Sequence, residues 1–143
     1  MSEHVTNLLL VEDDDVDVMT VRRALEKNHI GNPLFTATNG LEALEILRSD
    51  RMPAERRLVL LDLNMPKMNG IEFLRELRRD TALAATPVVV LTTSNNDRDK
   101  IEAYNLNVAG YLLKPVTFLR FVELMAALDK YWTLVEMPEC PKR

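Results

Sequence analysis

Short apolar runs alternate with segments of helical period along the chain. The runs occupy residues 7–11, 34–38, 58–61, 87–92 and 109–113. The intervening and final segments predict five helices over about 15–28, 40–49, 70–79, 96–105 and 116–134. The first, third and fourth runs are continuously apolar, which is typical of strands covered by helices on both faces. We therefore expect a doubly wound α/β fold with a five-stranded parallel sheet and five helices.

Length and composition fit one globular domain. The chain has 143 residues, of which 47% are hydrophobic, so it can bury the core of a single domain. No apolar run approaches the roughly 20 residues that cross a bilayer, so we expect a soluble protein without a membrane partner. The N-terminus lacks a signal-peptide pattern and the single cysteine, Cys140, has no intrachain partner, so we expect the cytoplasm. The net charge of −4 and the scattered basic residues argue against a nucleic-acid partner.

The carboxyl ends of the predicted strands carry polar groups that suit phosphate chemistry. Glu12 and Asp13 follow the first strand, Asp62 follows the third, Thr92 ends the fourth and Lys114 follows the fifth. Such ends meet at one edge of a parallel sheet, where three crowded carboxylates repel one another unless a cation lies between them. Oxygen ligands without His or Cys indicate Mg²⁺.

Each of these groups also has an ordinary structural interpretation. Asp14 or Asp15 can cap the first helix, Asp62 can initiate a turn, and "TTSNN" can be the loop that begins the fourth helix. A single lysine before proline is usually a solvated loop residue. The functional interpretation depends on four strands delivering such groups to the same edge.

Four motifs together resemble one family, the receiver domain of two-component response regulators. They are "VEDD", "LLDLNMPKMNG", "VVVLTTS" and "GYLLKP", and the resemblance covers residues 6 to about 134. It implies the flavodoxin-like receiver fold, with strand order 2-1-3-4-5, and a phosphorylation switch.

The resemblance also implies roles for individual residues. Asp62 corresponds to the aspartate that accepts a phosphoryl group from a histidine kinase. Mg²⁺ would be bound by Asp13, by Asp62 and by the main-chain carbonyl of Asn64, and through water by Glu12.

Three further residues correspond to the family's switch. Thr92 would bond the phosphoryl group, Lys114 would pair with it, and Tyr111 would turn inward on activation. The family also has a cis peptide at the position of Lys114 and Pro115, where proline makes such a bond accessible.

Too few residues follow Pro115 for a DNA-binding or enzymatic domain, so we expect output by protein contact. The contact face would combine the fourth helix, the fifth strand and the fifth helix. We expect a receiver domain over residues 1–134 and a tail over 135–143 that extends the last helix. Within that helix, the stripe of Phe118, Phe121, Met125 and Leu128 is expected to face the sheet.

Other apolar residues of the fourth helix, of the fifth helix and just beyond it predict a homodimer interface, because contiguous exposed apolar surface marks an interaction site. Trp132 can instead fold back on its own domain. The "YW" arm, together with "LLVEDD", "LTTSNN" and "SDRMPAERR", is similar to the single-domain regulators paired with bacterial phytochrome kinases, which suggests such a kinase as the donor. The predicted interface residues are Ile101, Tyr104, Leu124, Tyr131, Trp132, Leu134 and Val135.

Three other classes of protein compete with this interpretation. An aspartate-nucleophile phosphatase needs a second Asp two residues after the nucleophile, where this chain has Asn64, and a cap domain or long insertion for its substrate. A nucleotide-binding module needs a glycine-rich phosphate loop, which the four scattered glycines do not form. A phosphorylation-independent dimeric adaptor differs only in taking no phosphate. The expected protein is a phosphoacceptor and not an enzyme acting on other substrates.

Overall fold

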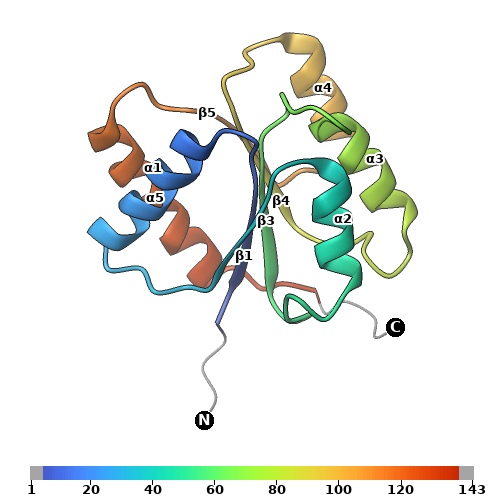
Figure 1. Cartoon of the computed structure of the whole chain (residues 1–143), viewed down its shortest axis with the longest axis horizontal. Helices are drawn as coiled ribbons and strands as arrows, with labels where there is room; N and C mark the ends of the chain where they lie inside the picture. Colours follow the sequence, from blue (N-terminus) through green and yellow to red (C-terminus); the bar gives the residue numbers. More distant parts are fainter. Residues whose placement is uncertain (1–4, 139–143) are drawn as a thin grey trace.

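The computed structural model describes residues 5–138, so Cys140 lies outside the described part of the chain. Strands and helices alternate strictly along the chain, as the sequence predicts (Figure 1). The elements are β1 (Asn7–Val11), α1 (Asp15–Lys27), β2 (Leu34–Ala37), α2 (Gly40–Arg48), β3 (Arg57–Leu61), α3 (Gly70–Arg79), β4 (Val88–Thr92), α4 (Asp97–Asn105), β5 (Gly110–Leu113) and α5 (Phe118–Leu134).

The five strands form one parallel sheet in the order β2-β1-β3-β4-β5, which confirms the predicted order. The chain first moves outward from β1 to β2 and then crosses to β3 on the other side of β1. Helices α1 and α5 therefore cover one face, and α2, α3 and α4 cover the other (Figure 1). The strand order reverses between β1 and β3, and a parallel sheet of this kind binds its ligands beside such a reversal.

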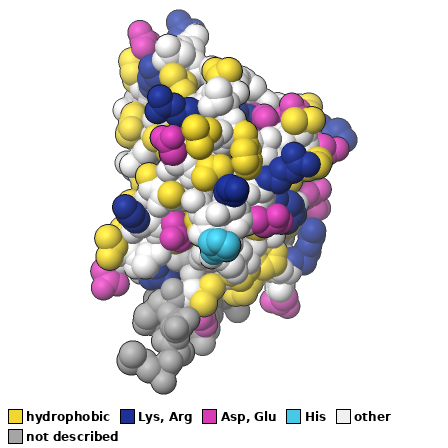
Figure 2. Space-filling model, turned by 90° about the vertical axis from the view of Figure 1, so that its left-hand side faces the viewer, with side chains coloured by type: hydrophobic (Ala, Val, Ile, Leu, Met, Phe, Trp, Pro, Cys, Tyr) yellow, Lys and Arg dark blue, Asp and Glu magenta, His cyan; other side chains and the backbone are white. Residues whose placement is uncertain are grey.

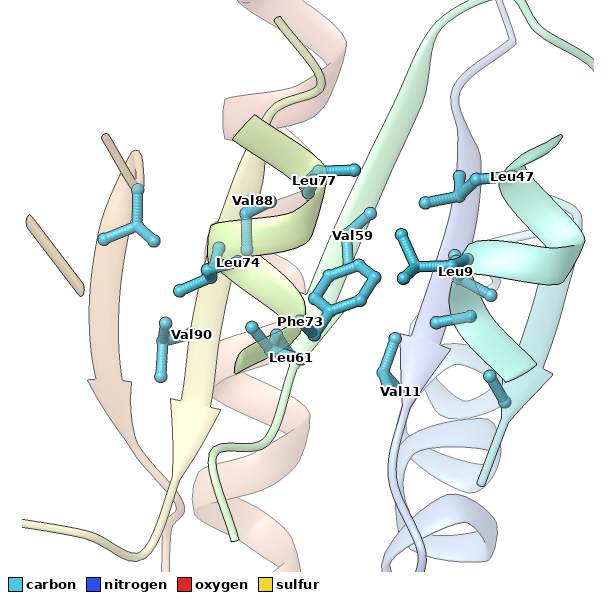
Figure 3. Close-up of a cluster of buried hydrophobic side chains, with 14 of the residues drawn as sticks. Leu9, Val11, Leu47, Val59, Leu61, Phe73, Leu74, Leu77, Val88 and Val90 are labelled. Atoms are coloured by element: carbon cyan, nitrogen blue, oxygen red, sulfur yellow. The ribbon is translucent and has the colours of Figure 1, made fainter. Parts of the chain in front are cut away.

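Alternate residues of the central strands feed two separate cores. Leu9, Val11, Val59 and Leu61 point to the face covered by α2 and α3, where they pack around Phe73 (Figure 3). Their neighbours in sequence point to the opposite face and pack against α1 and α5. That second core includes Leu8, Leu10, Leu58, Leu60, Phe121, Met125, Leu128 and Trp132.

The C-terminal helix differs from the prediction in two places. Helix α5 ends at Leu134, and its C-cap Val135 is extended, so the helix does not continue into residues 135–138. Phe118 begins the helix 44% exposed and does not face the sheet. The stripe that faces the sheet starts one turn later, at Phe121, because Phe118 lies at the helix start, next to the loop that leaves β5.

Trp132 is a core residue, and its predicted place in a dimer interface is wrong. Its side chain is 1% exposed and packs in the core beneath α1 and α5. Its main-chain oxygen accepts hydrogen bonds from Thr6 Oγ1 at 3.3 Å and from Arg56 Nη2 at 2.8 Å. Trp132 follows Leu128 by four residues on the helix, so it continues the stripe that faces the sheet.

Within residues 5–138, no helix combines the length and the apolar character that crossing a bilayer requires.

Candidate functional site at the carboxyl edge of the sheet

The reversal of strand order places the acidic residues that follow β1 and β3 side by side. Val11 pairs with Leu61 in the sheet, and the next residues along the two strands are Glu12 and Asp62. The Asp62 amide donates to Val11 O at 3.0 Å, which fixes the register at this edge. The Glu12 and Asp62 side chains are buried, and Asp13 beside them is exposed. One carboxylate oxygen from each of the three residues lies within 4.8 Å of the others.

The loop after Asp62 is held close to it by α3. A Cβ atom on Gly70 would lie 2.7 Å from the main-chain oxygen of Asp62, so only glycine allows this approach. Lys67 and Met68 in the same loop have φ angles of 48° and 80°, a region that non-glycine residues rarely adopt. Such strain persists only where the surrounding structure enforces it, and it is often found at functional sites.

A hydroxyl reaches Asp62 from β4. Thr92 is fully buried, and its Oγ1 donates to Asp62 Oδ1 at 2.7 Å. Tyr111 on β5 is half-buried against the core, and its hydroxyl donates to the main-chain oxygen of Ser94 at 2.8 Å. The two predicted switch residues are thus connected through the loop that leaves β4.

The ammonium group of Lys114 lies among three carboxylates. Its Nζ is 2.5 Å from Glu12 Oε1, 2.7 Å from Asp17 Oδ2 and 3.4 Å from Asp62 Oδ2. Burial by itself would lower the pKa of Lys114, but the hydrogen bonds to Asp17 and Glu12 and the nearby negative charges raise it above its ordinary value. Lys114 therefore stays charged at neutral pH.

Glu12 is the carboxylate that its surroundings perturb most clearly. Burial raises the pKa of Glu12 from 4.5 to about 7, and the charge of Asp62 adds to the increase. The hydrogen bonds from Lys114 and from the Asp14 amide act in the opposite direction without cancelling it. The single positive charge of Lys114 therefore does not fully offset the negative charge of the acidic groups at this edge.

The residues present fit a divalent cation. The three clustered side chains offer only oxygen atoms, and the cluster is open to solvent on the side of Asp13. A hard cation such as Mg²⁺ keeps several waters and binds through one or two carboxylates, which this arrangement can supply. An added positive charge would also offset the repulsion that perturbs Glu12.

The structure bears directly on two expectations at this edge, the cis peptide before Pro115 and the N-cap of α1. The peptide bond between Lys114 and Pro115 is not cis, since no described residue has a cis peptide, so that expectation is wrong. The trans form is the intrinsically favoured one even before proline, by about 0.5–1 kcal/mol. Asp14 is the N-cap of α1, as one alternative proposed, because its side chain accepts from the Val16 and Asp17 amides.

Sequence reasoning missed Asp17. It belongs to the acidic run "EDDDVD" after the first strand, but the prediction assigned it no role. Asp17 lies in the first turn of α1, where acidic residues commonly stabilise the helix dipole, so no sequence signal set it apart from its neighbours.

Comparisons with known proteins agree with this geometry. The sequence profile of the response regulator receiver domain matches residues 8–128. FilR2 of Methanothrix harundinacea, described as a probable methanogenesis regulatory protein, is 38% identical and is aligned over 87% of this chain and 82% of its own length. Response regulator Rcp1 of Synechocystis is 35% identical over 87% of each chain.

Two solved structures extend the likeness to three dimensions. The phosphorylated cyanobacterial phytochrome response regulator RcpA has a TM-score of 0.84 at 31% identity, covering 94% of this chain and 99% of its own. The Mn²⁺-bound form of Rcp1 has a TM-score of 0.79 at 35% identity, covering 93% and 99%. The chain therefore belongs to the response regulator receiver domain family and resembles the response regulators associated with phytochromes.

Proposed function

We propose that this protein is a phosphoacceptor signalling protein, in which Asp62 accepts a phosphoryl group from a histidine kinase in the presence of Mg²⁺. The observation that supports this most directly is the surrounding of Asp62. A buried carboxylate at a strand end has a hydroxyl at 2.7 Å and an ammonium at 3.4 Å, next to two further carboxylates. A purely structural aspartate would need neither the extra negative charge nor the opening to solvent.

The transfer is an exchange of one bond for another at phosphorus. An Asp62 carboxylate oxygen forms the new O–P bond while the N–P bond to the kinase histidine breaks. The imidazole nitrogen keeps the electron pair of the broken bond and takes up a proton. The strand and the Gly70 contact hold the carboxylate still, which keeps the nucleophile in line.

Asp13, Asp62 and the main-chain carbonyl of Asn64 would hold Mg²⁺, and Glu12 would contact it through water. When bound, the cation would neutralise charge on the transferring oxygens. Thr92 and Lys114 would then bind the remaining phosphoryl oxygens. Phosphorylation adds a charge of about −1.5 to −2 and new hydrogen-bond acceptors. These would draw Thr92 and Lys114 toward the phosphoryl group.

The output surface in this proposal adjoins Lys114 directly. A shallow groove of about 580 Å³ is lined by residues on both sides of it in the sequence, including Leu113 and Pro115. Val116 also lines the groove and is fully exposed, and Leu119 on α5 is 68% exposed. A movement of Lys114 toward a phosphoryl group would therefore displace the chain segment that lines the groove.

We also propose that the protein forms a homodimer through its exposed apolar residues on α4 and at the end of α5. Ile101 is 61% exposed, Tyr104 53% and Leu134 82%, and Tyr131 is also exposed. Leu124 and Val135 are only half-buried and can contribute at the margin. On the side formed by α1 and α5, hydrophobic side chains also lie exposed among charged ones (Figure 2). Trp132 takes no part in this interface.

The relatives suggest the donor. RcpA is a cyanobacterial phytochrome response regulator, so we propose a bacterial phytochrome kinase as partner of this chain. Phosphotransfer from such a kinase would place the protein in the cytoplasm.

Labelling of one variant tests the function. Purified protein is incubated with Mg²⁺ and a radioactive acyl phosphate, and then with phosphorylated histidine kinases. We expect the natural sequence to take up label and Asp62→Asn to take up none. Asp50→Asn is the matched control, because Asp50 is an exposed loop carboxylate. Equal labelling of Asp62→Asn would overturn the proposal, and an unlabelled natural sequence would favour the adaptor.

Sedimentation tests the dimer. Because Trp132 is buried, truncating the arm would damage the core, so point variants are needed. We expect Leu134→Glu and Ile101→Glu to shift the protein toward monomer at micromolar concentration. Leu41→Glu, at an exposed position on α2, should leave association unchanged. If all three variants sediment as the natural sequence does, α4 and the end of α5 do not form the interface.

A further inference from the structure

Asp17 belongs to the site but to none of the roles described so far. It lies on the first turn of α1, and its Oδ2 is 2.7 Å from Lys114 Nζ. The side chain of Asp17 is 30% exposed, while that of Lys114 is 9% exposed. The contact is therefore a partly shielded ion pair that joins α1 to the end of β5.

The position of Asp17 makes this contact unusual for its helix. Asp17 is the third residue after the N-cap Asp14, where an acidic side chain commonly turns back to the N-cap amide. Helix α3 shows that arrangement, since Glu72 bonds the Asn69 amide. In α1 the N-cap amide instead donates to Glu12 Oε2 at 3.2 Å, which leaves Asp17 available for Lys114.

The distances rank the three carboxylates around Lys114. An ammonium group has three donors, and the two shortest contacts go to Glu12 and Asp17. The contact with Asp62, the proposed phosphoacceptor, is the longest at 3.4 Å. Lys114 is thus held mainly by the two carboxylates that do not accept phosphate.

We propose that Asp17 is a positioning residue that competes with the incoming phosphoryl group for the Lys114 ammonium and thereby slows phosphorylation of Asp62. The inference rests on the proposed function. For Lys114 to bind a phosphoryl oxygen, its pairing with Asp17 must weaken. In Asp17→Asn, Glu12 would still hold Lys114, so the lysine would remain at the site with one ammonium hydrogen released.

Rates of phosphorylation by a small acyl phosphate test the competition. We expect Asp17→Asn to raise the initial rate about fivefold, the change that loss of one partly shielded ion pair would give. Asp15→Asn is the matched control, because Asp15 is an exposed residue of the same helical turn and the same charge is removed. A rate equal to that of Asp15→Asn, or slower than that of the natural sequence, would overturn the proposal.

The effect must also depend on Lys114. In a Lys114→Ala background, adding Asp17→Asn should change the rate by no more than Asp15→Asn does. A gain that persists without the lysine would show that Asp17 acts by general charge and not by positioning, which would overturn the proposal. Urea denaturation of each variant establishes that the compared proteins are folded.

A measurement without phosphate separates this inference from the proposed function. The Lys114 ammonium can be observed by ¹H–¹⁵N NMR in the unphosphorylated, metal-free protein. We expect Asp17→Asn to shift this resonance and Asp15→Asn to leave it in place. If no protein takes up label, the proposed function fails while the NMR result still reports on the contact. An unshifted resonance in Asp17→Asn would overturn the inference alone.

Discussion

The two ends of strand β3 both bury a charge, but they satisfy it in opposite ways. At the start, the Arg57 guanidinium donates to the main-chain oxygens of Leu47, Met52 and Pro53 at 2.6–2.8 Å. At the end, Asp62 faces a hydroxyl, an ammonium at 3.4 Å and two other carboxylates.

Under the proposed function, this difference separates a structural charge from a reactive one. Main-chain carbonyl oxygens accept hydrogen bonds from the Arg57 guanidinium and so hold the loop that precedes β3. Because these oxygens carry no net charge, this end of the strand has no excess negative charge. Around Asp62, negative charge exceeds positive charge, so the site gains from any added cation. In the proposed function, the cation and the phosphoryl group bind at the end where negative charge is in excess, and the Arg57 end contributes stability.

The largest effect on stability is expected at the amino end, from Trp132→Ala. Thr6 and Arg56 attach the Trp132 main chain to that end of the sheet, and its side chain fills the core. We expect a loss of about 4 kcal/mol in the free energy of unfolding, measured by urea denaturation. Leu119→Ala, at an exposed position on the same helix, should change it by less than about 0.5 kcal/mol. A small loss for Trp132→Ala would mean that the tryptophan is not core.

Arg57→Met should have the next largest effect. It keeps much of the side-chain volume but leaves three main-chain oxygens without the guanidinium. We expect a loss of about 3 kcal/mol, with phosphate acceptance by Asp62 retained in the folded fraction. Arg51→Met, in the same loop but exposed, is the control. Loss of phosphate acceptance from a fully folded Arg57→Met would contradict the separation of the two ends.

The pH dependence of stability should come from the carboxyl end. In the folded, metal-free protein the pKa of Glu12 is raised to about 7, so the folded state holds this proton more tightly than the unfolded chain does. That contribution is complete below about pH 4.5 and is lost as the pH rises through about 7. We expect stability to fall by about 1 kcal/mol between pH 6 and 8 without metal.

Two measurements check this origin. Glu12→Gln should remove the pH dependence between 6 and 8, and Mg²⁺ should bind more tightly as the pH rises through about 7, because a proton competes with the cation. An unchanged dependence in Glu12→Gln would assign it to another group.

Asp13→Asn should have the smallest effect on stability. Removing one of several mutually repelling carboxylates should leave metal-free stability unchanged or raised by less than about 0.5 kcal/mol. Mg²⁺ affinity should nevertheless fall by more than about tenfold, as titration calorimetry can measure, and phosphorylation should be blocked. Marked destabilisation in metal-free buffer would show that Asp13 is structural, and that this end resembles the Arg57 end.

The sequence by itself determined the elements and the site's main residues. Continuous apolar runs such as Leu58–Leu61 specify buried parallel strands, because only such strands need apolar side chains on both faces. Parallel strands then bring Glu12, Asp62 and Thr92 to one edge, and the structure confirms that they meet there.

Only the tertiary structure decided which apolar and acidic residues found a partner within the domain. Trp132 and Leu134 are both apolar residues at the end of one helix, yet one is 1% exposed and the other 82%. Likewise, Asp14 caps α1 while Asp17 in the same acidic run contacts Lys114, which is 97 residues away in the chain. Local pattern fixes the period of a helix, whereas its rotation against the sheet and the reach of a distant side chain depend on packing in three dimensions.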